Sequence, residues 1–264
     1  MNLLKRELAP ITPEAWAQID AEARRVLNLH LAARKVVDFK GPLGWEKGAV
    51  NTGRLSTVDA PLDDVSARVR VVLPLVELRA YFDLPIDELD DASRGADDLD
   101  FKPLIEAAAR IARAEDHAVF NGYAAAGIRG LIEASEHAPV SLAHARELPF
   151  AVVEAKEALR RAGVDGPYAL VLGPRLYDEN QAAAEDGYPI RSRVEPLVDR
   201  IVWAPALEHG ALVSMRGGDF ELTVGQDLSI GYASHDQSRV RLYLTESLTF
   251  RALETSAAVP LRRT

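Results

Sequence analysis

The sequence predicts an α+β protein, in which an antiparallel sheet near the C-terminus packs against long helices. Over residues 217–250, apolar and polar residues alternate, as they do in strands with one buried face. A polar turn at 234–238 reverses the chain between two such stretches. Apolar residues recur at helical spacing over 13–30 and again over 102–121. Both element types are therefore expected in one chain.

Composition limits the class of protein. The 264 residues can bury a large core, in one large domain or two modest ones. No cysteine is present, which excludes disulfides and cysteine-ligated metal sites. The net charge of −9 argues against nonspecific binding to nucleic acid, which depends on neutralising phosphates. We expect no signal peptide and no membrane span, because no apolar stretch is long enough.

Residues 13–30 have the pattern of an amphipathic helix. Thr12 can cap its N-terminus, and Pro13 suits the first helical turn. The apolar side contains Trp16, Ile19, Ala23, Val26 and Leu27. Packing on the core explains this stripe, and we interpret His30 as a surface or core histidine rather than a metal ligand. A short strand is expected at 36–39, ended by Gly41 and Pro42.

Two extended arms begin at residue 48 and predict a β-ribbon. The second arm alternates strictly over 65–73, with Val65, Val69 and Val71 on one face. Residues 57–64 form the tip between the arms. A lone two-stranded ribbon is only marginally stable in water. Its apolar face must therefore pack on its own domain or on a neighbouring molecule, and the residues alone leave both alternatives open.

Acidic residues gather in two places after the ribbon. An exposed acidic turn explains residues 87–91 better than a general acid–base pair or a metal site. The longest helix is expected from Lys102 to about residue 122. Within it, Glu115 and Asp116 could pair with Arg113 across helical turns.

The second half of the chain alternates between short helices and strands. We expect a loop with helical pieces over 127–149, followed by a helix at 152–162 that ends at Gly163. Further elements are a buried strand at 168–172, helices at 176–184 and 190–198, and strands at 201–204 and 211–215. In the C-terminal sheet, Phe220, Leu222 and Val224 should face the core, with Glu221 and Thr223 on the opposite face.

Motifs of common enzymes are missing from the sequence. It contains no G-x-S-x-G elbow, Walker loop, H-E-x-x-H or G-x-G-x-x-G. His235 and Asp236 lie in a hairpin tip, where solvent would spoil a catalytic dyad. The 217–219 segment is interpreted as a plain turn rather than a phosphate-binding nest. We expect no catalytic residues, no metal site and no enzyme activity.

The amino-acid sequence resembles those of the encapsulins, which are bacterial and archaeal nanocompartment shell proteins of the linocin or bacteriocin type. The resemblance is carried in order by LKRELAPI (4–11), PLVELRAYF (74–82), ELDDASRG (88–95), EDHAVFNG (115–122), GVDGPYALVL (163–172), GYPI (187–190), RGGDF (216–220), GQDLSIGY (225–232) and VRLYLTESLTF (240–250). It covers nearly the whole chain and implies the fold of tailed-phage major capsid proteins, of the Hong Kong phage type.

This resemblance implies a division of the chain into regions. Residues 1–47 would form the N-terminal helix and the start of a peripheral domain, 48–80 the extended loop that reaches adjacent subunits, 81–130 the peripheral domain with its spine helix, 131–203 an axial domain, and 204–264 the peripheral domain with the C-terminal strands. Val65, Val69 and Val71 are then inter-subunit residues of the loop.

The resemblance also implies function. The subunit would assemble into an icosahedral shell of about sixty copies, in the cytoplasm, and enclose a cargo enzyme captured through its C-terminal peptide. The matching peptide-binding positions are Arg34, Val36, Asp38, Phe39, Asp227, Leu228 and Ile230. Glu185, Asp186, Gly187 and Tyr188 match the fivefold pore loop, whose acidic groups would concentrate cations.

The pore charge slightly favours a ferritin-like, iron-mineralising cargo over a dye-decolourising peroxidase. Some relatives bind a flavin through an aromatic residue before Glu-Leu-Asp, but this chain has Asp87 there, so no flavin or other cofactor is expected. The alternative function is that of a phage or prophage capsid protein that packages DNA. The acidic balance and the N-terminal helix argue against that alternative, and no nucleic acid or membrane partner is expected.

Overall fold

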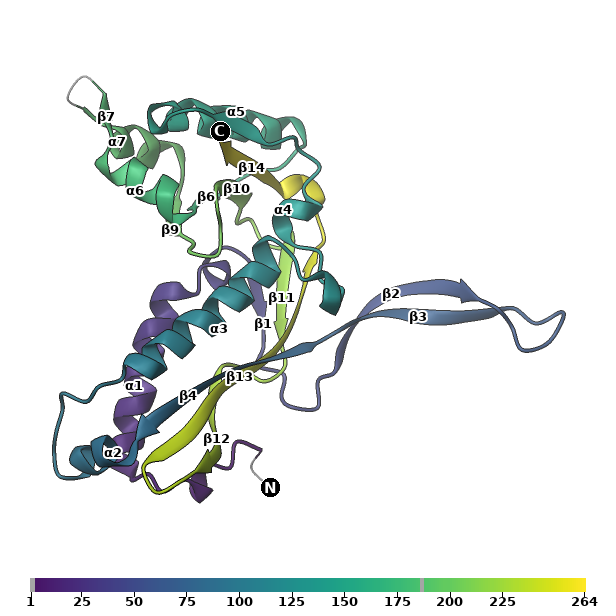
Figure 1. Cartoon of the computed structure of the whole chain (residues 1–264). Helices are drawn as coiled ribbons and strands as arrows, with labels where there is room; N and C mark the ends of the chain where they lie inside the picture. The colour runs from purple at the N-terminus through teal and green to yellow at the C-terminus, as the bar shows by residue number, and fades with distance from the viewer. Residues whose placement is uncertain (1–2, 186–187) are drawn as a thin grey trace.

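The computed structural model describes residues 3–185 and 188–264. Figure 1 shows two sheet-containing bodies, one above the other, and a long ribbon that projects sideways from the lower body. Both helices and strands contribute to each body, which confirms the predicted α+β class. The N-terminus lies at the lower body and the C-terminus at the upper one.

The lower body is built on a mixed sheet of β1 (Asp38–Lys40), β4 (Val76–Pro85), β11 (Phe220–Val224), β12 (Ser229–His235) and β13 (Arg239–Ala252). The strand order is β1-β11-β13-β12, and β4 also pairs with β13. The long strand β13 is therefore shared: it pairs with β12 near its start, with β11 near its end, and with β4 over most of its length. The predicted hairpin at 234–238 is confirmed.

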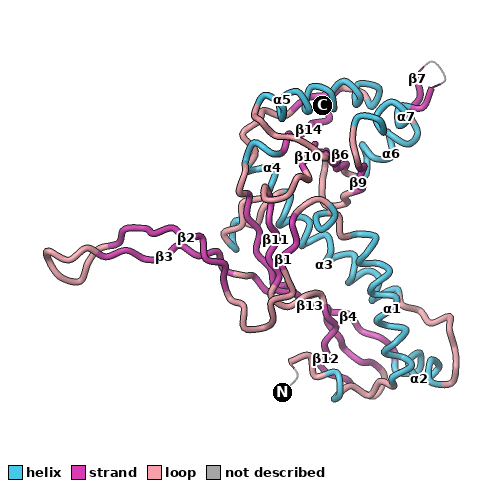
Figure 2. The backbone as a smooth tube through the Cα atoms, turned by 180° about the vertical axis from the view of Figure 1, so that it is seen from behind, coloured by secondary structure: helices cyan, strands magenta, loops and turns pink. Residues whose placement is uncertain are grey.

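Helices α1 (Pro13–His30), α2 (Ile86–Ser93) and α3 (Lys102–Phe120) complete the lower body (Figures 1 and 2). The start of α1 is fixed as expected, because the Thr12 hydroxyl accepts the Ala15 N–H at 3.3 Å and Pro13 occupies the first turn. The core between helices and sheet includes Ile19, Val26, Leu104, Ile111, Leu242 and Leu244.

The upper body holds a second five-stranded sheet, in the order β5-β14-β10-β6-β9. Its strands are β5 (Val140–Leu142), β6 (Tyr168–Leu172), β9 (Arg200–Trp203), β10 (Gly210–Ser214) and β14 (Ala258–Arg263). It is accompanied by α4 (Leu131–Ala134), α5 (Leu148–Arg161), α6 (Pro174–Ala182) and α7 (Ile190–Val194). Short 3₁₀ turns lie at Arg6–Leu8, Ala33–Lys35, Ala124–Ala126, Ala145–Glu147, Glu195–Leu197 and Thr255–Ala257.

This second sheet crosses the boundary drawn between residues 203 and 204. Strands β10 and β14 come after that boundary, yet β10 pairs with β6, and β14 lies between β10 and β5. The last strand is apolar at Val259 and Leu261, and both side chains are buried there. This short apolar segment was not predicted as a strand. Its burial places β14 inside the upper sheet, between β10 and β5.

Two expectations for single elements are wrong. Residues 87–91 lie in helix α2 rather than in an acidic turn, because Leu89 and Ala92 are buried on one side of that helix. Glu221 and Thr223 are buried rather than exposed on the outer face of β11. Lys40 and Arg251 form ion pairs with Glu221, which offsets the cost of burying its charge.

The ribbon consists of β2 (Ala49–Val58) and β3 (Ala67–Pro74), which pair with each other in a sheet of their own. The register shifts between Asn51 and Leu55, where the ribbon carries a bulge. A second small hairpin, β7 (Ala184–Glu185) with β8 (Tyr188–Pro189), stands at the tip of the upper body (Figure 1). Among the described residues, no helix combines the length and apolar character that a membrane crossing requires.

Candidate functional site

A groove of about 390 Å³ runs between α1 and the start of β12. Its apolar lining includes Leu27 in α1, Leu31 just after α1, Leu228 just before β12, and Ile230 and Leu244 in the sheet. Polar residues on its walls are Arg6, Asp20, Arg24, Asn28, Arg34 and Asp227. An apolar floor with a few fixed polar groups is the usual design of a site for a small ligand or a peptide side chain.

Arg34 links this groove to the interior of the lower body. Its Nε donates to both oxygens of Glu115 at 2.9 Å, and its Nη2 donates to Glu115 at 2.6 Å and to Glu246 at 3.2 Å. Its Nη1 donates to Asp227 at 2.8 Å. A guanidinium has five N–H donors, so one on Nη1 remains. Arg34 can therefore offer a bound peptide at most a single hydrogen bond.

The pairing suggested within α3 is wrong. Glu115 binds Arg34 instead of Arg113, because its side chain points from α3 toward the sheet and is fully buried. The Asp116 carboxylate accepts the backbone N–H groups of Ala32 and Ala33 at 2.8–3.1 Å. Burial raises the pKa of Asp116 to about 7, although these backbone bonds act to lower it. Both carboxyls thus tie α3 to the turn that follows α1.

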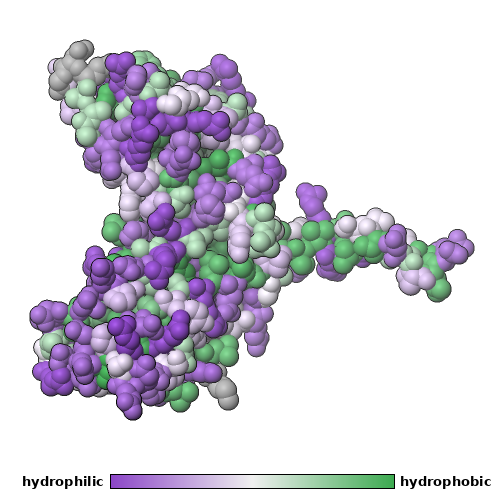
Figure 3. All heavy atoms as spheres, in the orientation of Figure 1, coloured by the Kyte–Doolittle hydropathy of each residue, from purple (hydrophilic) through white to green (hydrophobic). Residues whose placement is uncertain are grey.

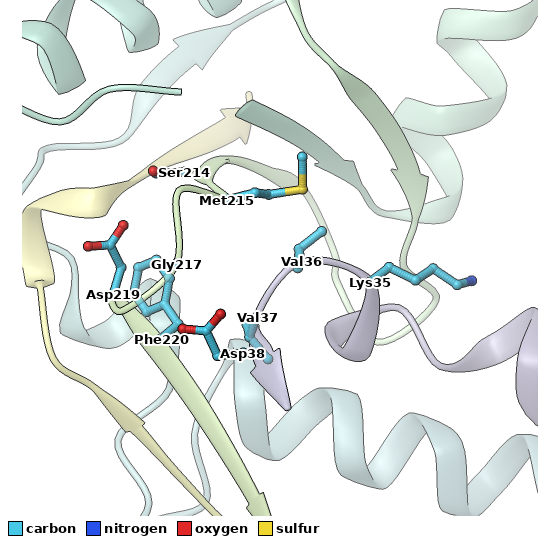
Figure 4. Close-up of a pocket in the computed structure, with 9 residues that line it drawn as sticks. All are labelled: Lys35, Val36, Val37, Asp38, Ser214, Met215, Gly217, Asp219 and Phe220. Carbon is cyan, nitrogen blue, oxygen red and sulfur yellow. The ribbon is translucent and has the colours of Figure 1, made fainter. Parts of the chain in front are cut away.

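The predicted peptide-binding residues do not share one hollow. Arg34, Asp227, Leu228 and Ile230 line the groove, whereas Val36 and Asp38 line a second, smaller hollow of about 170 Å³. Figure 4 shows this second hollow between the start of β1 and the 214–220 segment.

In the second hollow, Asp38 has an internal partner. Its Oδ2 accepts the Gly218 N–H at 2.6 Å. Arg216, which precedes the 217–219 segment, donates to the Asp219 carboxylate at 2.9–3.1 Å. The Lys35 side chain extends away from both carboxylates (Figure 4). Hydrogen bonds from other residues of the same chain therefore hold this loop, as expected for a plain turn.

Phe39 lies close to Arg34. The Arg34 guanidinium carbon is 4.9 Å from the centre of the Phe39 ring, a cation–π distance. The ring remains 37% exposed. Phe39 is thus an accessible aromatic surface that is coupled to the groove through Arg34.

Glu246 is a component of this site that the sequence analysis missed. It is fully buried on β13, and Arg34 is its ion-pair partner. A signal was present, because Glu246 has the same parity in its strand as the core residues Leu242, Leu244 and Leu248. A carboxyl placed on the buried face of a strand requires a partner, and Arg34 is that partner.

The ribbon exposes the predicted apolar residues. Val65 and Val69 are each 52% exposed, and Val71 is partly buried. Leu55, Val58, Leu62 and Val72 on the same ribbon are exposed as well. Figure 3 shows hydrophobic side chains along the ribbon, including its outer part, which projects away from both bodies. The described part of the chain leaves this surface uncovered.

Two of the predicted pore residues, Glu185 and Tyr188, belong to strands β7 and β8 at the tip of the upper body. The backbone of Glu185 pairs with that of Tyr188, whose side chain is 73% exposed. Asp186 and Gly187 lie outside the described residues.

Metal ligands do not gather in the described ranges, where no group of three or more histidine, aspartate or glutamate side chains could hold an ion. His30 packs against Trp203, with ring centres 5.3 Å apart, and burial together with nearby Arg113 and Lys35 lowers its pKa. It behaves as a packed histidine, as the sequence analysis interpreted it.

Comparison with known proteins gives consistent matches. Residues 1–249 match the family described as "Encapsulating protein for peroxidase". The chain is 51% identical to the type 1 encapsulin shell protein of Rhodospirillum rubrum, over 99% of this chain and 97% of the relative. It is 46% identical to the type 1 encapsulin shell protein of Mycobacterium tuberculosis, over 99% of both chains.

Solved structures agree in fold. A virus-like particle from Pyrococcus furiosus matches with a TM-score of 0.67 and 16% identity, covering 94% of this chain and 99% of that one. The capsid of Myoviridae phage XM1 matches with a TM-score of 0.55 and 12% identity, over 89% and 92% of the two chains. These likenesses confirm the expected tailed-phage capsid fold.

Proposed function

The chain belongs to the encapsulin shell protein family, and we propose that it is a self-assembling subunit of a hollow icosahedral particle that encloses a cargo protein. The observation that carries this proposal is the ribbon of β2 and β3, which exposes apolar side chains on a hairpin that pairs with no other described strand. Burial of that surface by a neighbouring copy would stabilise the ribbon and join the subunits.

The geometry of such contacts favours a closed particle. The ribbon and the surface that receives it are different parts of one chain, so the contact is heterologous and closes only around a rotation axis. Around fivefold and threefold axes it would produce a shell of about sixty copies. Each subunit gives and receives several contacts, so the closed shell should resist dissociation strongly. We place it in the cytoplasm.

Cargo capture is assigned to the groove between α1 and β12. Its apolar floor suits the side chains of an extended C-terminal peptide, and Asp227 and the free N–H of Arg34 can bind polar groups of that peptide. Val36, Asp38 and Phe39 would extend the contact toward the second hollow.

Substitution in the groove tests cargo capture. Leu228→Ala and Ile230→Ala should give intact but empty shells, because each removes apolar surface from the groove. Leu253→Ala changes an exposed apolar residue outside the groove and should leave loading unchanged. If both groove variants retained the full cargo ratio, the peptide site would lie elsewhere.

We further propose that the hairpin of β7 and β8 lines a fivefold pore. Acidic residues Glu185 and Asp186 would repeat around that axis and attract divalent cations by focusing the field. This charge favours a ferritin-like, iron-handling cargo, although the matching family is described by its encapsulation of a peroxidase. The double variant Glu185→Gln with Asp186→Asn should slow iron uptake into loaded shells. Unchanged uptake kinetics would remove the pore proposal.

A phage capsid protein that packages DNA is the alternative with the same fold. The 51% identity to a named encapsulin shell protein supports the nanocompartment instead, as does the net charge of −9. We propose a structural rather than a catalytic role for the chain. Negative-stain microscopy of the purified protein, with mass analysis of what copurifies, tests both points. A stable monomer, or shells filled with DNA, would contradict the proposal.

A further inference from the structure

We propose that Glu246, buried beneath the peptide groove, is held as a neutral carboxylic acid and positions Arg34 and Asp227 for peptide binding, which makes that binding proton-linked. This inference rests on the proposed function of the groove. It concerns a residue that does not line the groove and acts only through Arg34.

The charges around Arg34 are unequal in number. One guanidinium, that of Arg34, faces three carboxyls: Glu115 at 2.6 Å, Asp227 at 2.8 Å and Glu246 at 3.2 Å. The side chain of Asp227 is 37% exposed, so water can stabilise its charge. Glu115 and Glu246 are fully buried. Two buried carboxylates beside a single cation would leave uncompensated negative charge in the interior, which is strongly unfavourable.

The bonding identifies which carboxyl takes the proton. Glu115 receives hydrogen bonds from both Nε and Nη2 of Arg34, which is the pattern of an ionised partner. Glu246 receives a single, longer one on Oε2, and its Oε1 has no partner among the described atoms. A proton on Glu246 can form a hydrogen bond with the neighbouring Glu115 carboxyl, since the two lie within reach of each other. Protonation therefore satisfies both groups.

The surroundings favour the neutral form. Burial raises the pKa of Glu246 well above its ordinary value, and the charge of Glu115 and the hydrogen bond to it raise it further. Asp227, in the connection between β11 and β12, also raises it, whereas the charge of Arg34 lowers it. On the adjacent strand β4, the residue opposite Glu246 is Leu78, which brings no charge.

Asp227 connects this proton to the groove. Its Oδ1 accepts both the Arg34 Nη1–H and the Leu228 N–H at 2.8 Å, so it fixes the start of the groove wall. If Glu246 lost its proton, two buried carboxylates would compete for the guanidinium and weaken its bond to Asp227. Leu228 and the wall beyond it would then be held less firmly. Peptide affinity should fall as the pH rises.

Infrared difference spectroscopy of assembled shells tests the protonation without any ligand. At neutral pH, the wild-type spectrum should contain a protonated-carboxyl band that is lost in Glu246→Gln. Asp116 can contribute a second such band, so the readout is the component lost on substitution. Glu77→Gln is the matched control, because Glu77 lies on β4 opposite Ser247 with an exposed side chain. Loss of no component in Glu246→Gln would overturn the proposal.

Peptide binding tests the positioning role. The probe is a fluorescein-labelled synthetic peptide of about eight residues, with leucine at alternate positions so that one face is apolar. Its dissociation constant should rise by up to about tenfold per pH unit above the apparent pKa in wild type and Glu77→Gln. Glu246→Gln, which cannot lose a proton, should bind with a flat profile. Equal pH slopes in wild type and Glu246→Gln would overturn the positioning role.

Two further outcomes are decisive. If Glu246→Gln does not assemble, Glu115→Gln replaces it: with one buried carboxyl left for Arg34, Glu246 should ionise and the band should disappear. A band that persists in Glu115→Gln contradicts the proposal. If the probe binds no variant and Ile230→Ala shells still load cargo, the groove function fails. The infrared band then decides the state of Glu246 separately.

Discussion

Replacing Val69 by Asp on the ribbon should stop assembly while leaving the subunit folded. Val69 is 52% exposed, and its cross-strand partner is Ser56 of the same ribbon. The ribbon forms a sheet of its own, apart from the sheets of the two bodies. An aspartate at this position therefore costs the isolated subunit little.

The cost appears in the shell. Full burial of a valine side chain contributes about 1.5–3 kcal/mol, so covering the exposed half of Val69 contributes about 1 kcal/mol. An unpaired carboxylate buried at the same place costs several kcal/mol more. A sum of about 4 kcal/mol weakens each ribbon contact roughly a thousandfold. Every subunit in a closed shell would suffer this loss, so the effects accumulate around the particle.

Size-exclusion chromatography with light scattering, together with negative-stain microscopy, measures the result. Circular dichroism establishes that the variant remains folded. Thr57→Asp is the matched control: it adds the same charge to the same ribbon, but Thr57 lies opposite Arg68, with which an aspartate can pair. We expect Thr57→Asp to form shells and Val69→Asp to remain small. Shells of Val69→Asp in wild-type yield would refute the idea that a neighbour covers this face.

Three other predictions concern the folded subunit. Arg34→Met removes the cation that the buried Glu115 and Glu246 share, so calorimetry at neutral pH should show destabilisation of about 3–5 kcal/mol; an unchanged melting temperature would contradict this. The folded pKa of Asp116 is raised from 3.8 to about 7, so its stabilising contribution is complete below about pH 4 and is lost as the pH rises to about 7, by at most about 4 kcal/mol. The melting temperature of wild type relative to Asp116→Asn should fall over that interval, and parallel curves would argue against it. Truncation after residue 257 removes β14 from between β5 and β10 and should give insoluble protein, whereas soluble shells would show that the upper sheet does not need this strand.

The periodic elements could be predicted from the sequence because one local rule determines each of them. Helices α1 and α3 have continuous apolar stripes of helical spacing, and both occur within a residue or two of the expected bounds. The ribbon and the hairpin of β12 and β13 follow from alternation around polar turns. In each case the partners are close in sequence, so pattern and structure agree.

The buried charges could not be predicted in this way. Arg34 bonds to residues 81, 193 and 212 positions away, and no spacing rule connects such partners. Glu221 was placed on the face opposite the core because its ion-pair partner Lys40 lies on β1, far upstream in the chain, and only the fold pairs β1 with β11. The same holds for β14, whose six residues become an interior strand of the upper sheet only through long-range pairing.

Local and long-range interactions therefore have different roles in this chain. The buried charges of the lower body pair inside one subunit, where Arg34 joins α3, β13 and the groove wall. These ion pairs do not require a neighbouring subunit. The ribbon has the opposite character: its hydrogen bonds are local, but its apolar surface has no cover within the described chain. A subunit of this kind should fold before it assembles, because the interactions that define its bodies do not depend on the contact that joins the copies. Charge-changing substitutions should therefore act differently in the two places. Those in the ribbon should alter the yield of particles, and those in the groove should alter the amount of cargo inside them.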